Sequence, residues 1–151
     1  MTAYPRRSVG REGGRLLCGL SSCENSNITS IAADRLGARS AALICTDGMP
    51  SASQQVLLRQ LSGQGARLHY HGDFDWPGLQ IANIVMRTFA ARPWRMRAAD
   101  YTPRRGRTLT GEPVVASWDA KLTPRMAAVG YVLEEEAVVD GLLEDLQQGA
   151  E

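Results

Sequence analysis

The chain has 151 residues, of which 17 are lysine or arginine and 16 are aspartate or glutamate, so its formal net charge is +1. This length predicts one domain that buries its own core, and the balanced charge excludes a uniform polycation of the histone kind. The three cysteines lack C-x-x-C spacing and no apolar run approaches the about 18 residues of a membrane span, so we expect a cytoplasmic protein without disulfides, structural zinc or a membrane partner.

Residues 1–14 are rich in glycine and arginine and contain almost no apolar side chains, which predicts a flexible tail or a severed linker before a domain over residues 15–148. Short apolar strands then alternate with helices, a pattern typical of a parallel sheet covered on both faces. The predicted strands are residues 16–22, 41–45 and 66–71, and the predicted helices are residues 28–36, 51–61 and 77–89.

The pattern is looser after residue 89. We predict a further strand at residues 94–98 and a terminal helix at residues 134–147. Residues 102–118, between them, are rich in proline, glycine and arginine and are expected to be irregular. Three glutamates at 134–136 fit the acidic first turn of that helix. We therefore expect an α/β fold with a mostly parallel sheet of four or five strands, helices on both faces and a C-terminal extension.

The segment 71–82 (HGDFDWPGLQIA) joins a predicted strand to a predicted helix. If the strand continues through Asp75, the side chains of Asp73 and Asp75 point the same way, and two adjacent carboxylates favour a divalent cation. Pro77 suits the first turn of the helix, and Gly78 allows a close approach of backbone or ligand. The alternative is that the two aspartates only cap the helix.

Glu24 follows the first predicted strand. The carboxyl ends of parallel strands lie along one edge of a sheet, so we expect Glu24 to meet Asp73 and Asp75 there. Three carboxylates close together repel one another unless a cation lies between them, and oxygen-only ligands favour Mg²⁺ or Mn²⁺. Asp47 lies at the same edge, where a turn is the simpler interpretation; the alternative is that it supports the ligands of the first metal or binds a second one.

This arrangement, a glutamate after the first strand and Asp-x-Asp after the third, resembles the Toprim domain over residues 15–98. The string DFDWPGLQI at 73–81 is similar to the Asp-x-Asp-x-x-Gly-x-x-Ile version in the A subunit of topoisomerase VI and its meiotic relatives. Nearly the whole chain also resembles the C-terminal domain of a large bacterial family long described as of unknown function. The motifs that carry this second resemblance are CEN at 23–25, CTDGMPS at 45–51, HGDFDWPG at 71–78, PWRM at 93–96 and WD at 118–119.

The second resemblance implies the nuclease subunit of a Wadjet-type plasmid-defence system, in which a Toprim subunit cuts DNA presented by an SMC-like ATPase complex. It implies that Glu24, Asp73 and Asp75 are catalytic and hold Mg²⁺ or Mn²⁺, and that a long N-terminal region precedes this domain in family members. The alternatives are a non-catalytic metal-dependent module that holds DNA or assembles a complex, a strand transesterase with a tyrosine-bearing partner domain, and a degenerate fragment of a larger Toprim protein.

Arginines are concentrated between residues 87 and 107, where there are seven of them and one acid, Asp100, whereas only acids follow Arg125. We expect a basic surface that faces DNA, with Arg95 and Arg97 as phosphate contacts. The alternative is that these arginines form ion pairs with the acidic C-terminal helix.

Overall fold

The computed structural model describes residues 11–12, 15–16 and 19–149. Four strands form one all-parallel sheet in the order β4-β3-β5-β6, with β3 and β5 in the middle. Their bounds are Gly19–Cys23 (β3), Leu43–Cys45 (β4), Arg67–Tyr70 (β5) and Arg92–Pro93 (β6). The expected tail lies outside the described residues except for Arg11–Glu12 (β1), which pairs antiparallel with Arg15–Leu16 (β2).

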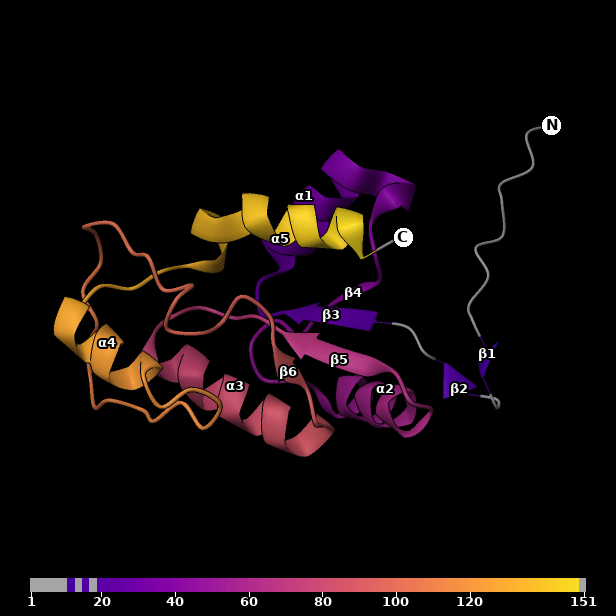
Figure 1. The fold of residues 1–151 in the computed structure, drawn as a ribbon, viewed down its shortest axis with the longest axis horizontal. Helices are drawn as coiled ribbons and strands as arrows, with labels where there is room; N and C mark the ends of the chain where they lie inside the picture. Colours follow the sequence, from indigo (N-terminus) through magenta and orange to yellow (C-terminus); the bar gives the residue numbers. More distant parts are fainter. Residues whose placement is uncertain (1–10, 13–14, 17–18, 150–151) are drawn as a thin grey trace.

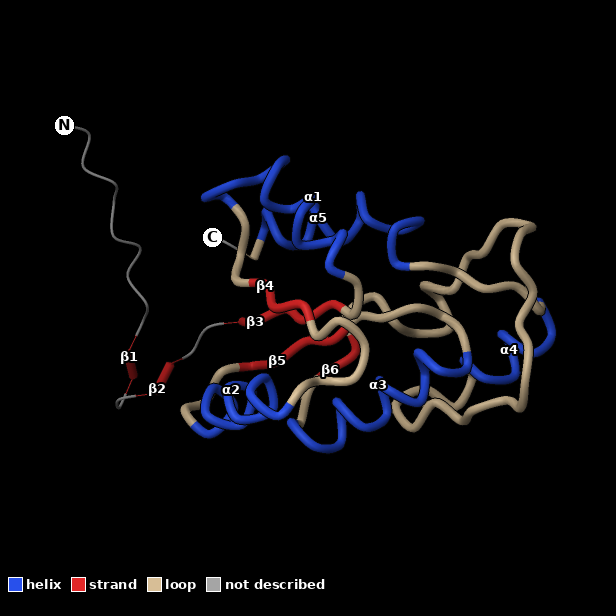
Figure 2. Tube along the Cα trace, turned by 180° about the vertical axis from the view of Figure 1, so that it is seen from behind, coloured by secondary structure: helices blue, strands red, loops and turns tan. Residues whose placement is uncertain are grey.

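Helices cover both faces of this sheet (Figures 1 and 2). Helices α1 (Ser26–Leu36) and α5 (Val139–Gln148) lie on one face, and α2 (Ala52–Gly63) and α3 (Trp76–Phe89) lie on the other. A short 3-10 helix, η1 (Gly37–Arg39), follows α1. The predicted α/β class, with a four-stranded parallel sheet and helices on both faces, is confirmed, and the arrangement is consistent with a Toprim-like fold.

The helix ends have local causes that the sequence displays. Ser51 and Gln54 form a reciprocal capping box at the start of α2. Asn25 caps α1 by accepting a hydrogen bond from the backbone N–H of Asn27, and Gly37 ends that helix with a positive φ of 53°. The caps at Asn25 and Ser51 fix where the chain turns from β3 into α1 and from the loop after β4 into α2.

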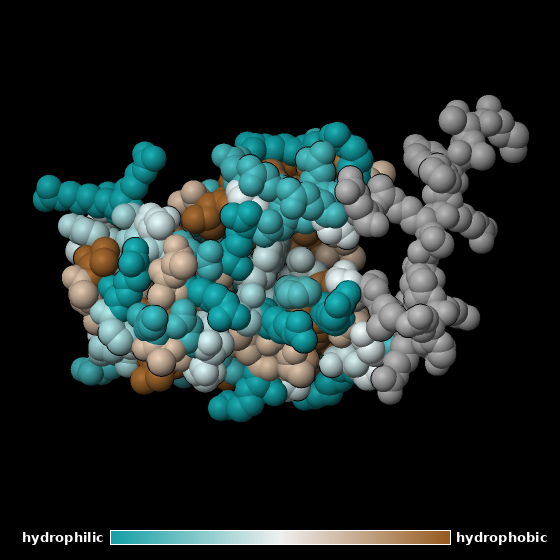
Figure 3. Space-filling model, in the orientation of Figure 1, coloured by the Kyte–Doolittle hydropathy of each residue, from teal (hydrophilic) through white to brown (hydrophobic). Residues whose placement is uncertain are grey.

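Each face of the sheet has its own hydrophobic cluster. One cluster joins the sheet to α2, α3 and the later helix α4 (Leu122–Val129), and it contains Tyr70 and Phe74. The other joins the sheet to α1 and α5 and contains Cys23. Across the described ranges no helix is long and apolar enough to cross a membrane, and the face seen in Figure 3 is mostly hydrophilic.

The predictions for the C-terminal third need correction. Residues 94–98 do not form a strand, because β6 ends at Pro93 and Arg95 has a φ of 44°, which interrupts an extended chain. The terminal helix begins at Val139, after the 3-10 helix η2 (Glu135–Val138). Helix α4 was not predicted, since it has only 8 residues and contains Pro124 in its first turn.

The carboxyl ends of β3 and β5 point toward the half of the molecule that contains α4 and the long irregular connection 99–121 (Figure 1). This connection is anchored by an antiparallel bridge between Thr108 and Tyr131. The edge of the sheet at which ligands bind in open α/β folds is therefore bordered by the C-terminal third of the chain.

A candidate acidic site at the carboxyl edge of the sheet

Glu24 and Asp73 meet at the carboxyl ends of neighbouring strands. Glu24 directly follows β3, and Asp73 follows β5 after a short turn through His71 and Gly72. The backbone N–H of Asp73 donates to Oε2 of Glu24 across 3.3 Å. The edge rule for parallel strands thus places these two predicted site residues side by side.

Asp73 and Asp75 flank a single bridging residue rather than extending β5, which ends at Tyr70. The backbone of Phe74 pairs with that of Leu133 in an antiparallel bridge, with N···O distances of 2.9 and 3.3 Å. Phe74 is fully buried, and side chains alternate along an extended chain, so Asp73 and Asp75 share the side opposite to it.

Asp75 has the capping role that the sequence left open as an alternative. Its Oδ1 accepts a hydrogen bond of 2.7 Å from the backbone N–H of Gly78, and it forms the N-cap of α3. A Cβ at position 78 would lie 2.2 Å from the carbonyl oxygen of Asp73, so only glycine permits this approach. Gly78 therefore fixes the main chain of Asp73 against the first turn of α3.

Glu135 completes the site and was not identified from the sequence. Its fully buried carboxylate accepts hydrogen bonds from the backbone N–H groups of Glu24 (3.0 Å) and Asn25 (2.6 Å). Its own backbone N–H donates to Oδ1 of Asp73 at 2.8 Å. Glu135 thus joins the end of β3 to the segment after β5. Nothing in the local sequence distinguishes it from Glu134 and Glu136, since its partners are 110 and 111 residues away.

Burial, and after it the charge of the neighbouring acids, raises the pKa values of three carboxyl groups in this site. Burial, followed by the charge of Asp73, raises the pKa of Glu24 to about 7, against the opposing hydrogen bond from Asp73. Burial raises the pKa of Glu135 to about 8, although its two backbone N–H donors favour the ionised form. Burial also raises the pKa of Asp73. The site therefore takes up protons near neutral pH unless a cation compensates the negative charge.

The oxygen atoms of the site fit a hard divalent cation in their chemistry. Glu24, Asp73 and Asp75 each use one carboxylate oxygen to accept a backbone N–H. The second oxygens of Glu24 and Asp73 are possible ligand atoms, and that of Asp75 becomes one if Arg107, 3.8 Å away, turns aside. Within the described ranges no three acidic, histidine or cysteine side chains already form a ligand set, so a cation would require these carboxylates to rotate.

A buried donor without a partner faces the same acids. The hydroxyl of Tyr70 is fully buried and has no hydrogen-bond partner among the described residues. A Cβ at Gly72 would lie 2.8 Å from Oε2 of Glu24 and 3.1 Å from the Tyr70 oxygen. Both oxygens therefore lie on the side of Gly72 where a side chain would project. An unsatisfied buried donor beside carboxylates supports a ligand-binding role for the cluster.

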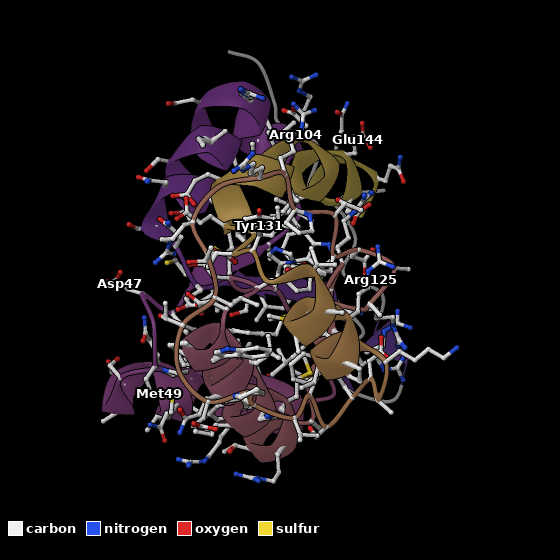
Figure 4. The ribbon with its side chains drawn as sticks, turned by 90° about the vertical axis from the view of Figure 1, so that its left-hand side faces the viewer. Asp47, Met49, Arg104, Arg125, Tyr131 and Glu144 are labelled. Atoms are coloured by element: carbon white, nitrogen blue, oxygen red, sulfur yellow. The ribbon has the colours of Figure 1, made fainter. Side chains whose placement is uncertain are left out.

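Asp47 lies in the loop after β4, next to a residue that contacts the main chain of Glu24. It occupies the exposed loop between β4 and α2 with a φ of 52°, and Figure 4 shows it at the outer edge of the molecule. The turn interpretation accounts for its conformation. The following residue, Gly48, donates its backbone N–H to the carbonyl oxygen of Glu24 across 3.3 Å.

The two arginines expected to contact DNA have different surroundings. Arg95 forms a bidentate pair with Asp145 of α5, with distances of 2.6 and 2.8 Å, and lies 3.9 Å from Glu144. This is the internal pairing with the acidic helix that the sequence left open as an alternative. Arg97 is exposed, and its contact with DNA stays a prediction.

Comparison with known proteins identifies a family. A protein-family model described as "Protein of unknown function C-terminus (DUF2399)" matches residues 7–146. This range contains Glu24, Asp73, Asp75 and Glu135. No curated protein and no solved structure gives a significant match.

Proposed function

The chain belongs to the DUF2399 family, and we propose that this domain is a nuclease that hydrolyses phosphodiester bonds of DNA with the help of Mg²⁺ or Mn²⁺. The observation that carries the proposal is the meeting of Glu24 and Asp73 at the ends of two central parallel strands, with Asp75 two residues further on. Acidic residues in this position are suited to hold a cation against a phosphate.

Glu24, Asp73 and Asp75 would hold the cation through the carboxylate oxygens that do not accept backbone N–H groups. A bound cation would neutralise the negative charge that develops on the phosphate. It would also lower the pKa of a water molecule bound to it. Without a cation the pKa of Glu24 is raised to about 7, so this carboxylate would be an alternative general acid or base if it does not bind the cation. Glu135 and Gly78 hold the main chain at Glu24 and Asp73, so the acids keep their relative positions.

The resemblance of residues 15–98 to the Toprim domain supports the same function. On this basis we propose that the domain acts within a Wadjet-type defence complex, on DNA presented by an SMC-like ATPase. The expected N-terminal region of such proteins would then supply contacts to the partner subunits.

A second candidate function is a non-catalytic module that holds DNA through a bound cation. One observation favours it. Glu24, Asp73 and Asp75 each accept a hydrogen bond from a backbone N–H, and the bond to Asp75 caps α3. Acids with these structural tasks would be retained in a domain that binds metal and phosphate without cutting.

Nicking of supercoiled plasmid with Mn²⁺ or Mg²⁺ separates the two candidates. We expect wild-type protein to nick the plasmid, and Asp73→Asn and Glu24→Gln to lose this activity, whereas Asp34→Asn, on the exposed side of α1, keeps it. Mn²⁺ binding is measured in parallel by calorimetry. If the wild-type protein binds metal but does not nick the plasmid, the holding module is favoured. If Asp73→Asn and Glu24→Gln keep both metal binding and nicking, both candidates are contradicted.

A further inference from the structure

A cavity of about 570 Å³ lies between residues 102–107 and residues 132–138. Two basic side chains, Arg104 and Arg107, line it together with the acidic Glu134. The apolar part of its wall comes from Val132, Leu133, Ala137 and Val138. It thus combines a small excess of positive charge with an apolar surface, at a size typical of small-molecule sites.

Backbone pairing joins the two chain segments that line this cavity. The N–H of Val132 donates to the carbonyl oxygen of Arg107 at 2.8 Å, and that of Leu109 donates to Gly130 at 2.9 Å. Thr108 and Tyr131 form the bridge between these two bonds. Figure 4 shows Arg104 on the loop beside α5, with Tyr131 below it.

Arg107 connects the cavity to the acidic site. One of its guanidinium nitrogens, Nη2, lies 3.2 Å from Oε1 of Glu134 and 3.8 Å from Oδ2 of Asp75. The Arg107 side chain is 61% exposed, so it can turn from Asp75 toward an incoming anion. A ligand in the cavity would therefore lie next to the carboxylates.

The cavity continues along the start of α5. A second cavity of about 370 Å³ shares Thr102, Ala137 and Val138 with the first. Its wall carries Asp100 and Asp140 as well as Arg95, and Arg95 is paired with Asp145. The positive charge that an anion could use is therefore concentrated in the first cavity, at Arg104 and Arg107.

We propose that this cavity binds one nucleotide of a single-stranded segment of DNA, next to the bond that the acidic site cleaves. The inference rests on the proposed nuclease function and names the form of its substrate. Arg104 and Arg107 bind phosphate oxygens, because a guanidinium matches phosphate geometry with paired N–H donors. The base packs against Val132, Ala137 and Val138. A base reaches such a cavity only when it is unpaired and unstacked, so a duplex segment does not fill it.

Binding of labelled oligonucleotides in chelator tests the proposal without metal or cleavage. The probes are an oligothymidylate of about eight nucleotides and a fully paired duplex, followed by fluorescence anisotropy at low salt. Arg104→Ala removes a charge, and Ala137→Trp fills the cavity without changing charge. Arg67→Ala is the matched control, since Arg67 is exposed at the opposite end of β5.

We expect Arg104→Ala and Ala137→Trp each to weaken binding of the single strand about tenfold, the first through loss of a phosphate contact and the second through exclusion of the base. Arg104→Ala should also reduce the salt slope by about 0.7, whereas Ala137→Trp leaves the slope unchanged. Arg67→Ala should leave single-strand binding within about twofold, and Ala137→Trp should leave duplex binding unchanged. Thermal melting of each variant confirms folding, and Ala137→Leu replaces the tryptophan variant if the latter melts early.

Wild-type-like binding of the single strand by the cavity-filling variant would overturn the proposal. An equal loss of duplex and single-strand binding in Arg104→Ala, with no effect of the filled cavity, would overturn it too, because Arg104 would then contact a duplex backbone. These results are independent of catalysis. A protein that binds the single strand as expected but never nicks DNA would contradict the nuclease function and leave the cavity assignment intact.

Discussion

The backbone N–H of Glu135 donates to Oδ1 of Asp73 across 2.8 Å, and this bond links positions 62 residues apart. The carboxylate of the same glutamate accepts the backbone N–H groups of Glu24 and Asn25. Both ends of the acidic site are therefore held by one residue of η2. The orientation of the candidate metal ligands depends on a segment that carries none of the predicted site residues.

Replacing Glu135 by alanine should destabilise the protein. The change removes the acceptor for two partly buried backbone N–H groups, and the expected loss is about 2 kcal/mol in the free energy of unfolding, measured with urea. Glu135→Gln is the control, because its amide oxygen still accepts a hydrogen bond while the charge is absent. An equal loss in both variants would indicate that the negative charge, rather than the acceptor, is required.

In chelator, thermal stability should fall as the pH rises from about 5 to 8. The pKa values of Glu24 and Glu135 in the folded protein, about 7 and about 8, lie above the ordinary value of 4.5, so the folded state binds more protons than the unfolded state in this window. The stabilisation is complete below the ordinary pKa and is lost as the pH passes through the folded values. Calorimetry at several pH values measures it.

Two comparisons control this pH experiment. The double variant Glu24→Gln, Glu135→Gln should show a flatter dependence of Tm on pH over the same window. Added Mg²⁺ should raise the Tm of the wild-type protein most at pH 8, where the carboxylates are ionised. Burial lowers the pKa of His71 to about 4, which opposes the fall in stability below pH 6.5, so the decisive window is pH 6.5 to 8. A wild-type Tm that rises in that window in chelator would contradict the direction of the Glu24 and Glu135 shifts.

Tyr70→Phe should leave stability unchanged or slightly raised, because the hydroxyl it removes is buried without a partner. We expect the affinity for Mn²⁺ to fall about tenfold, since the hydroxyl lies on the same side of Gly72 as Oε2 of Glu24 and would donate to that carboxylate once a cation is bound. Tyr101→Phe is the matched control. The Tyr101 hydroxyl donates to the carbonyl oxygen of Tyr131, so this variant should lose about 1 kcal/mol of stability with unchanged Mn²⁺ affinity. Unchanged Mn²⁺ affinity in Tyr70→Phe would exclude that role.

Gly78→Ala should damage the site and the fold together. The new Cβ would lie 2.2 Å from the carbonyl oxygen of Asp73, so Asp73 must move or α3 must begin later. We expect a loss of about 2 kcal/mol or more and weaker Mn²⁺ binding. Gly63→Ala, where a Cβ meets nothing within 4 Å, should be tolerated. Denaturant titration and calorimetry measure the two effects.

Arg95 and Arg97 should behave differently when replaced by alanine. Arg95→Ala should lower stability by about 1 kcal/mol through loss of the pair with Asp145. Arg97→Ala should leave stability unchanged and reduce the salt slope of DNA binding by about 0.9 for one phosphate contact to duplex DNA. An unchanged salt slope for Arg97→Ala would remove this residue from the DNA surface.

The sequence predicts the features that depend on short-range pattern and on the geometry of parallel strands. The neighbouring positions of Glu24 and Asp73 follow from one rule, that parallel strands end at a common edge, and the close packing at Gly78 follows from the absence of a side chain. The Asp-x-Asp spacing predicts a shared side, although the reason is the bridge from Phe74 to Leu133 rather than a longer β5.

The remaining features depend on contacts between distant parts of the chain. The packing of the C-terminal third on the sheet determines which of the three glutamates at 134–136 is buried, namely Glu135. It also brings Arg95 to Asp145. The strand predicted at residues 94–98 is wrong for a local reason. Arg95 has a positive φ, and no glycine, asparagine or aspartate stands at that position to indicate it. The hydrophobic pattern did not show α4, because its 8 residues are too few for a clear period.

The long separation between Glu24 and its partner Glu135 has a consequence for synthesis on the ribosome. A nascent chain displays Glu24 and both aspartates well before Glu135 emerges, 111 residues after Glu24. Until then the backbone N–H groups at the end of β3 lack the carboxylate that accepts them, and Asp73 lacks the donor from Glu135. We therefore expect the acidic edge to become organised only when η2 docks on the sheet.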